Sequence, residues 1–224
     1  MRDPLSKQVV ELKPSGIRKF FDIVSEMKDA ISLGVGEPDF ATPWHIRDEG
    51  IYSLEQGHTK YTSNAGLMKL REEICHYLYR TQGIHYHPTK EVLITVGGSE
   101  AIDIGIRAMI NPGEGEEVLI PQPSYVSYEP CKPVIIDLKA ENEFRLTPEE
   151  LKAAITPKTK LLILPFPNNP TGAIMEKKDL EAIADIIIEN DIYVMSDEIY
   201  GELTYKDKHV SIASLPGMKE RTLL

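Results

Sequence analysis

The sequence has few cysteines, no long apolar run and a deficit of positive charge. Cys75 and Cys131 lie far apart and form no CxxC pair, so we expect reduced thiols in a cytoplasmic protein. No apolar run approaches the roughly 20 residues of a membrane span, and the first residues carry no apolar signal region. The 25 lysines and arginines against 35 acidic residues give a net charge of −10, which argues against a nucleic-acid or anionic-membrane surface.

Several common catalytic and metal-binding motifs are also missing. Six histidines occur without an HExxH motif or a Cys/His cluster, so we expect no metal site. No G-x-S-x-G elbow is present, which disfavours a Ser-His-Asp hydrolase. The glycine pair Gly97–Gly98 continues into neither G-K-[ST] nor GxGxxG, so it is neither a Walker loop nor a dinucleotide fingerprint.

From residue 91 onward, apolar runs alternate regularly with amphipathic segments. Apolar runs that predict strands occupy residues 91–96, 116–121, 133–138, 160–167 and 192–196. Segments that predict helices occupy residues 99–110, 124–131, 147–155 and 176–190, with Thr147 as an N-cap. Strands that are apolar throughout and separated by helices imply a parallel or mostly parallel sheet covered on both faces. The chain is therefore predicted to have an α/β fold.

The first 90 residues are mixed. Two segments predict helices: residues 42–57, with Thr42 as cap and Pro43 at the first helical position, and residues 65–83, with Gly83 as the stop signal. Residues 15–27 carry an apolar face, and residues 30–40 read as a short strand followed by a turn.

Ligands of open α/β sheets bind beyond the carboxyl ends of the strands. The segments that follow the expected strands should therefore lie together, namely residues 97–99, 121–125, 165–172 and 196–200. Asp197 stands out among them, because a carboxylate at the tip of a buried strand is costly without a cationic or hydrogen-bonding partner.

The same segments carry groups that suit a flat, anionic ligand. Gly97, Gly98 and Ser99 at a helix start would let an anion approach the backbone, although a plain tight turn explains them equally well. Asn168 and Asn169 lie in a loop pinned by three prolines. A rigid scaffold that presents one amide to a ligand explains this loop better than a simple turn does. Tyr125 and Tyr128 suit either packing or stacking on a heteroaromatic ring.

Six stretches, taken together, resemble the class I/II aminotransferases, which are fold-type I enzymes dependent on pyridoxal 5'-phosphate (PLP). They are "SLGVGEPDF", "TKYTSNAGLMKLREEI", "TVGGSEAI", "IPQPSYVSYEP", "PNNPTGAI" and "SDEIYGELTY". Within the family the similarity is to bacterial and archaeal aspartate/aromatic-type and PatA-like enzymes. The resemblance implies the mostly parallel, seven-stranded-type sheet of the family's major domain in residues 46–224. Residues 1–45 would form an N-terminal arm and part of the small domain.

The resemblance also implies site residues. The cofactor-binding set would be Gly98, Ser99 and Glu100 at the phosphate, Tyr125 stacked on the ring, Asn169 and Tyr200 at the phenolic oxygen, Asp197 at the pyridine nitrogen, and Tyr61 reaching the partner subunit's phosphate. The substrate-binding set would be Gly36, Asn169 and Tyr125. These roles imply a homodimer with shared active sites that acts on an amino acid and a 2-oxo acid.

The sequence departs from the family pattern in two places. No lysine lies in a context that matches the family's Schiff-base lysine, so no catalytic residue is identified, and we expect the chain to stop before the end of the major domain and to be inactive alone. The connection at Cys131–Lys132 is shorter than in the family, which suggests a deletion or a missing segment.

Three functions remain open from the sequence. The first is a PLP-dependent aminotransferase for aspartate-like or aromatic amino acids. The second is a PLP-dependent β-lyase or related synthase of the same fold, since the motifs of this part of the chain barely separate the two. The third is a non-catalytic PLP-binding fragment or sensor domain.

Overall fold

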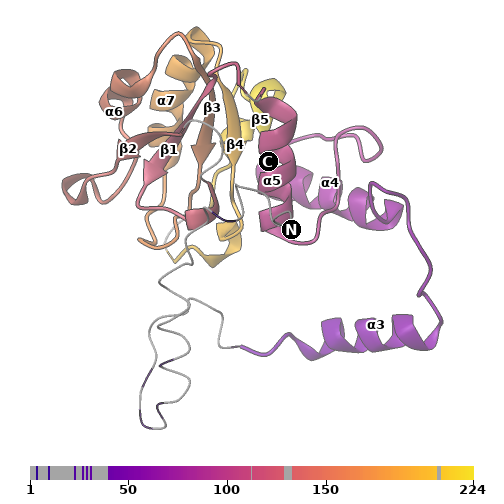
Figure 1. The fold of residues 1–224 in the computed structure, drawn as a ribbon. Helices are drawn as coiled ribbons and strands as arrows, with labels where there is room; N and C mark the ends of the chain where they lie inside the picture. The colour runs from indigo at the N-terminus through magenta and orange to yellow at the C-terminus, as the bar shows by residue number, and fades with distance from the viewer. Residues whose placement is uncertain are drawn as a thin grey trace. The chain divides into compact units, whose positions relative to one another are not determined.

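The computed structural model describes residues 40–111, 113–128, 133–205 and 208–224, together with Pro4, Val10, Ile23, Met27, Asp29 and Ile31. The chain divides into two compact units, Met1–Lys60 and Tyr61–Leu224 (Figure 1). The expected helix over residues 15–27 and strand over residues 30–40 lie almost wholly outside the described residues, and the short connection at Cys131–Lys132 lies outside them entirely. No helix in the described part of the chain is long and apolar enough to cross a membrane.

The first unit contains helix α3, Trp44–Glu55. The predicted cap at Thr42 is wrong, because Pro43 has an extended backbone (φ −51°, ψ 141°) and is itself the N-cap. The helix therefore begins one residue later than expected, without a side-chain cap.

The second unit begins with helix α4, Met68–Gln82. Gly83 ends it in the left-handed conformation (φ 71°), which suits glycine because glycine has no Cβ. The predicted stop signal is confirmed.

Five parallel strands form one sheet in the order β2-β1-β3-β4-β5. They are β1 Glu117–Gln122, β2 Pro133–Asp137, β3 Thr159–Leu164, β4 Tyr193–Ser196 and β5 Thr222–Leu223. This architecture confirms the predicted α/β fold with a parallel sheet.

One expected strand is not formed. Residues 91–96 pair with no strand of the described sheet. The amide of Ile94 instead donates to the carbonyl of Ala65 at 3.1 Å. Without a partner strand, Leu93 and Val96 remain 51% and 89% exposed. An apolar run therefore indicated strand propensity here, but a strand also needs a neighbour to pair with.

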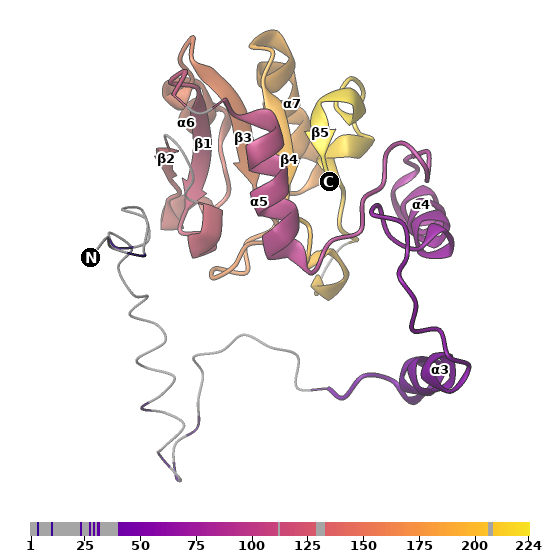
Figure 2. The ribbon, with the colours of Figure 1, turned by 45° about the vertical axis from the view of Figure 1, so that its right-hand side comes forward.

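Helices cover both faces of the sheet. Helix α5, Gly98–Met109, packs on one face, and helices α6, Pro148–Ala154, and α7, Lys177–Glu189, pack on the other (Figure 2). Alternate residues of β3 enter opposite cores: Leu161 and Ile163 join the α5 side, whereas Leu162 and Leu164 join the α7 side. This two-sided burial explains why the strand is apolar throughout.

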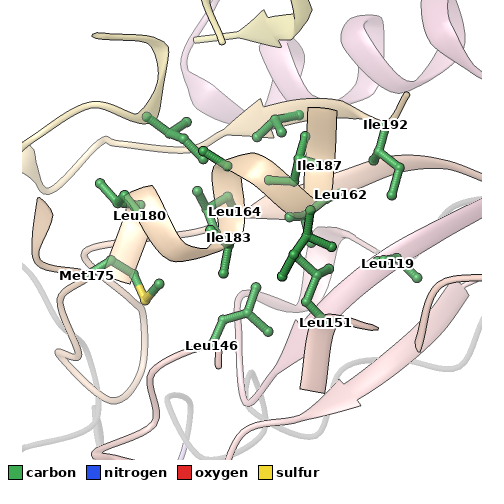
Figure 3. Packing of buried hydrophobic residues seen from close by; sticks show 14 of the residues in the cluster. Leu119, Leu146, Leu151, Leu162, Leu164, Met175, Leu180, Ile183, Ile187 and Ile192 are labelled. Carbon is green, nitrogen blue, oxygen red and sulfur yellow. The ribbon is translucent and has the colours of Figure 1, made fainter. Parts of the chain in front are cut away.

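The larger core lies between the sheet and α7 (Figure 3). There the stripe of Leu180, Ile183 and Ile187 on α7 meets Leu162 and Leu164 of the sheet. Helix α6 begins with the predicted Thr147 cap, whose hydroxyl accepts from the amide of Glu150 at 3.2 Å.

Short 3-10 turns complete the described fold. The helix expected over residues 124–131 is represented by one such turn, η1 Val126–Tyr128, and residues 129–132 are not described. The others are η2 Ala140–Asn142, η3 Gly201–Leu203, η4 Ile212–Ser214 and η5 Lys219–Arg221.

Candidate active site at the carboxyl ends of the strands

Loops from β1, β3 and β4 meet the start of α5 at the carboxyl edge of the sheet. The hydroxyls of Ser99 and Tyr125 are 3.3 Å apart, which links α5 to the loop after β1. The hydroxyl of Tyr128 donates to Oδ2 of Asp197 at 2.6 Å, which links that loop to the end of β4. Residues almost 100 positions apart therefore share one site, as the predicted parallel topology requires.

The start of α5 is open to an anion. Gly97 has φ 81°, and nothing lies within 4 Å of where its Cβ would be. The nearest atom to a Cβ on Gly98 would be Cδ1 of Ile199, at 3.9 Å. The first amides of a helix lack intrahelical acceptors, so those of Gly98, Ser99 and Glu100 can bind an anion at this exposed end.

Asp197 extends the sheet and presents a carboxylate at its edge. Its amide donates to the carbonyl of Leu164 at 3.1 Å, which continues the pairing of β3 with β4. Its Oδ1 accepts from the amide of Ile199 at 3.2 Å, and its Oδ2 accepts from Tyr128. All these donors are neutral, and Asp197 forms no ion pair with the described residues. A carboxylate oxygen has two lone pairs, so each can still accept from a cationic donor.

The two tyrosines of the loop after β1 have different environments. Tyr128 is 3% exposed, and burial, followed by the hydrogen bond to Asp197, raises its pKa well above the usual range. It therefore stays protonated and donates to Asp197. Tyr125 is 36% exposed and meets Tyr128 edge to face, with ring centroids 5.6 Å apart. Its bonds to Ser127 and Ser99 lower the pKa of its hydroxyl.

The two asparagines of the proline loop also differ in their burial and in their hydrogen bonds. Asn168 is 4% exposed, donates to the carbonyl of Pro123 at 3.2 Å and accepts from the hydroxyl of Thr171 at 2.8 Å. These bonds hold the loop after β3 against the loop after β1. Asn169, the next residue, is exposed, so the buried amide acts as scaffold and the exposed one is available to a ligand.

The remaining predicted residues lie outside the hydrogen bonds that join Ser99 to Tyr125 and Tyr128 to Asp197. Tyr200 is half-buried and near enough to Tyr128 to contribute to the raised pKa of that residue. Tyr61 is fully exposed at the start of the second unit. The side chain of Glu100 is exposed and accepts from the amide of Val96. Gly36 lies outside the described residues.

Sequence reasoning missed a second carboxylate in the same turn. Glu198 pairs with His209 at 2.6 Å, and both side chains are largely buried, at 11% and 13% exposure. The signal in the sequence was the Asp-Glu pair at a strand end, but no spacing rule links Glu198 to a histidine eleven residues later.

A surface cavity of about 440 Å³ lies elsewhere and shares no residue with the carboxyl-edge set. It is lined by Arg145, Glu176 and Asp179 among others. Arg145 is already paired with Glu143, Glu176 and Asp179, so this cavity presents no free guanidinium.

Known proteins resemble this chain over nearly its whole length. The aspartate aminotransferase of Pyrococcus abyssi is 49% identical over 98% of the chain and 58% of its own length. The aromatic-amino-acid aminotransferase 2 of Thermococcus litoralis is 45% identical over 98% of the chain and 58% of its own length. The crystal structure of Thermus thermophilus aspartate aminotransferase with maleate has a TM-score of 0.90 and 37% identity, and covers 99% of this chain and 59% of that one.

The chain therefore spans a little under three fifths of these relatives. The profile of the family described as aminotransferase class I and II matches residues 28–223, a range that contains the strands, the glycine turn and the Asp197 turn described above. The chain belongs to the class I and II aminotransferase family.

Proposed function

We propose that the protein containing this chain is a PLP-dependent aminotransferase that moves an amino group from an aspartate-like or aromatic L-amino acid to a 2-oxo acid. The observation that carries the proposal is the carboxyl-edge site. There Ser99, at the open start of α5, hydrogen-bonds to the exposed Tyr125. Tyr125 meets the buried Tyr128 edge to face, and Tyr128 donates to the Asp197 carboxylate. Family membership and the names of the relatives support the same reaction.

The residues present fit the chemical groups of PLP. The free amides of Gly98, Ser99 and Glu100 suit a phosphate dianion at a helix N-terminus. The half-exposed ring of Tyr125 offers an aromatic face. Asp197, which has neutral donors but no ion pair in the described part of the chain, suits a protonated pyridine nitrogen. When bound, PLP supplies an electron sink for the substrate's Cα.

Asp197 would hold a proton at the ring nitrogen. A carboxylate favours the charged form of a bonded N–H group, and the hydrogen bonds from Tyr128 and Ile199 fix the direction in which Asp197 presents its oxygens. Asn169 and Tyr200 would bind the phenolic oxygen, and Gly36, Asn169 and Tyr125 would lie beside the substrate.

The remaining assignments complete the proposal. Tyr61, fully exposed in this single chain, would reach the phosphate held by the partner subunit of a homodimer. Residues 1–45 would form the arm and part of the small domain, and residues 46–224 the cofactor-binding domain. The Schiff-base lysine matches no position of these 224 residues, so the chain alone would bind PLP without catalysing transfer. Two cysteines without a CxxC pair support a cytoplasmic location.

Titration of the 224-residue chain with PLP tests the binding part of this proposal. We expect saturable changes in cofactor absorbance and tyrosine fluorescence, with much weaker binding of pyridoxal, which lacks the phosphate. Equal binding of PLP and pyridoxal would refute the role of the α5 amides. No binding of PLP would refute the cofactor site.

An assay of the full-length protein tests the reaction. With L-aspartate or L-tyrosine as donor and 2-oxoglutarate as acceptor, we expect glutamate to form in equal amounts to the donor's 2-oxo acid. Release of pyruvate and ammonia without amino exchange would instead identify a β-lyase.

A further inference from the structure

A cluster of buried polar groups supports the Asp197 turn from behind. Oε1 of Glu198 accepts from the hydroxyls of Ser196 and Ser211, both at 2.8 Å. Oε2 lies 2.6 Å from Nε2 of His209. Both oxygens of a nearly buried carboxylate therefore have donors, which is the condition under which such a group is tolerated in a protein interior.

The cluster joins three segments of the chain. Nε2 of Gln82, at the end of α4, donates to the carbonyl of His209 at 3.1 Å. Oε1 of the same side chain accepts from the amide of Ser211 at 2.9 Å. Gln82 thus holds residues 209–211 in place through both ends of its amide, and these residues in turn hold Glu198.

His209 also contacts the far side of the turn. A Cβ on Gly201 would lie 3.0 Å from Cδ2 of the imidazole, so the backbone of the turn passes close to the ring. The amide of Gly201 donates to the carbonyl of Glu198 at 2.8 Å. The turn over residues 197–201 is therefore held at Glu198 by hydrogen bonds, and the ring of His209 lies close to its backbone at Gly201.

We propose that His209 and Glu198 are positioning residues that set the orientation of Asp197 and Tyr200 toward the cofactor. The turn that they hold carries both of those residues, and neither His209 nor Glu198 needs to touch the ligand. Without the His209 donor, Glu198 would keep a buried, partly unsatisfied carboxylate, which favours movement of the turn toward solvent. The identity of the ligand as PLP rests on the proposed function, whereas the support of the turn does not.

Two substitutions at one position test the inference. His209→Leu removes the donor, whereas His209→Gln keeps a side-chain N–H that can reach Glu198. A matched control is Glu116→Gln, which weakens a partly buried pair with Lys160 (2.7 Å) at the opposite edge of the sheet. Each variant of the 224-residue chain would be compared with the original by PLP titration, by hydrogen exchange of residues 197–201 and by melting temperature.

We expect His209→Leu to weaken PLP binding about tenfold and to speed exchange at residues 197–201 by a similar factor, since a hydrogen bond to a charged group is lost. We expect His209→Gln to restore most of the PLP affinity and most of the slow exchange at residues 197–201. We expect Glu116→Gln to change neither the affinity nor the exchange. The inference is overturned if His209→Leu lowers only the melting temperature, as a purely structural residue would. If the original chain does not bind PLP at all, the proposed function fails, and hydrogen exchange alone still decides whether His209 and Glu198 hold the turn.

Discussion

Glu116, at the amino edge of the sheet, differs in its partners from Asp197, at the carboxyl edge. At the amino edge, Glu116 pairs with Lys160 at 2.7 Å, so the fold itself provides the cation. At the carboxyl edge, Asp197 takes only neutral donors, from Tyr128 and Ile199. Glu116 is thus neutralised by an ion pair, whereas Asp197 holds a charge that the described part of the chain does not neutralise by an ion pair.

Topology explains why the difference falls this way. In a parallel sheet every strand ends at the same edge. The start of α5 lies there too, because Ser99 hydrogen-bonds to Tyr125 of the loop after β1. Open helix amides and a carboxylate therefore meet at one edge. They suit a ligand that carries both an anion and a cation.

The largest expected effect is that of Asp197→Asn. We expect PLP binding to weaken about a hundredfold, because a charged partner of the ring nitrogen is lost. Folding should change little, since the asparagine oxygen can still accept from Ile199 or Tyr128. PLP titration and thermal unfolding measure the two effects.

Asp137→Asn is the matched control for this change. Asp137 also ends a strand, β2, at the same edge, but it is exposed. If both variants bind PLP equally well, Asp197 has no special role at the cofactor.

A smaller effect is expected for Tyr128→Phe. Loss of the hydroxyl removes a donor from Asp197, so we expect PLP binding to weaken about tenfold.

The substitution of Tyr128 by phenylalanine should also alter the stability of the chain at high pH. The pKa of Tyr128 is raised above its ordinary value of 10.0, so its contribution to stability is complete below that pH and is lost as the pH rises through the folded-state pKa.

Urea unfolding in alkaline solution checks this second effect. The variant should lose stability less steeply than the original chain above about pH 10. The variant should still lose some stability as the pH rises, because burial also raises the pKa of Tyr86, to about 12. An unchanged slope would contradict the coupling of Tyr128 to burial and to Asp197.

The smallest effect is expected at the amino edge, for Lys160→Met. The hydrogen bond from Lys160 lowers the pKa of Glu116 below its ordinary 4.5, so the pair contributes stability above that pH and loses it as the pH falls through the folded-state pKa. Removing the lysine should lower the melting temperature slightly at neutral pH and hardly at all in acid. An ion pair that is still partly exposed to water seldom contributes more.

Lys177→Met provides the comparison for this change, since it breaks an exposed pair with Glu181. Neither variant should alter PLP binding. Weakened binding in Lys160→Met would show that the two edges of the sheet are coupled and that Glu116 and Asp197 do not act independently.

Much of the fold was predictable because its signals are local. The apolar stripe of α7, the Thr147 cap of α6 and the Gly83 stop of α4 depend on residues within one or two turns. Residues 91–96 could not be predicted in this way, because a strand exists only with a neighbour. The short strand β5 carries no periodic pattern of its own, because it has only two residues.

The sequence by itself determined the alternation of strands and helices, the sheet edge at which the candidate site residues gather, and membership of the family. Only the tertiary structure decided which of two nearby residues of similar chemistry is buried and which partner each of them has. Asn168 is buried and Asn169 exposed, and Tyr128 is buried whereas Tyr125 is more open. Asp197 faces the loop after β1, whereas Glu198 faces His209. Adjacent or nearby residues look alike in sequence, but burial and hydrogen-bond partners come from segments far along the chain, and those partners assign each residue its role.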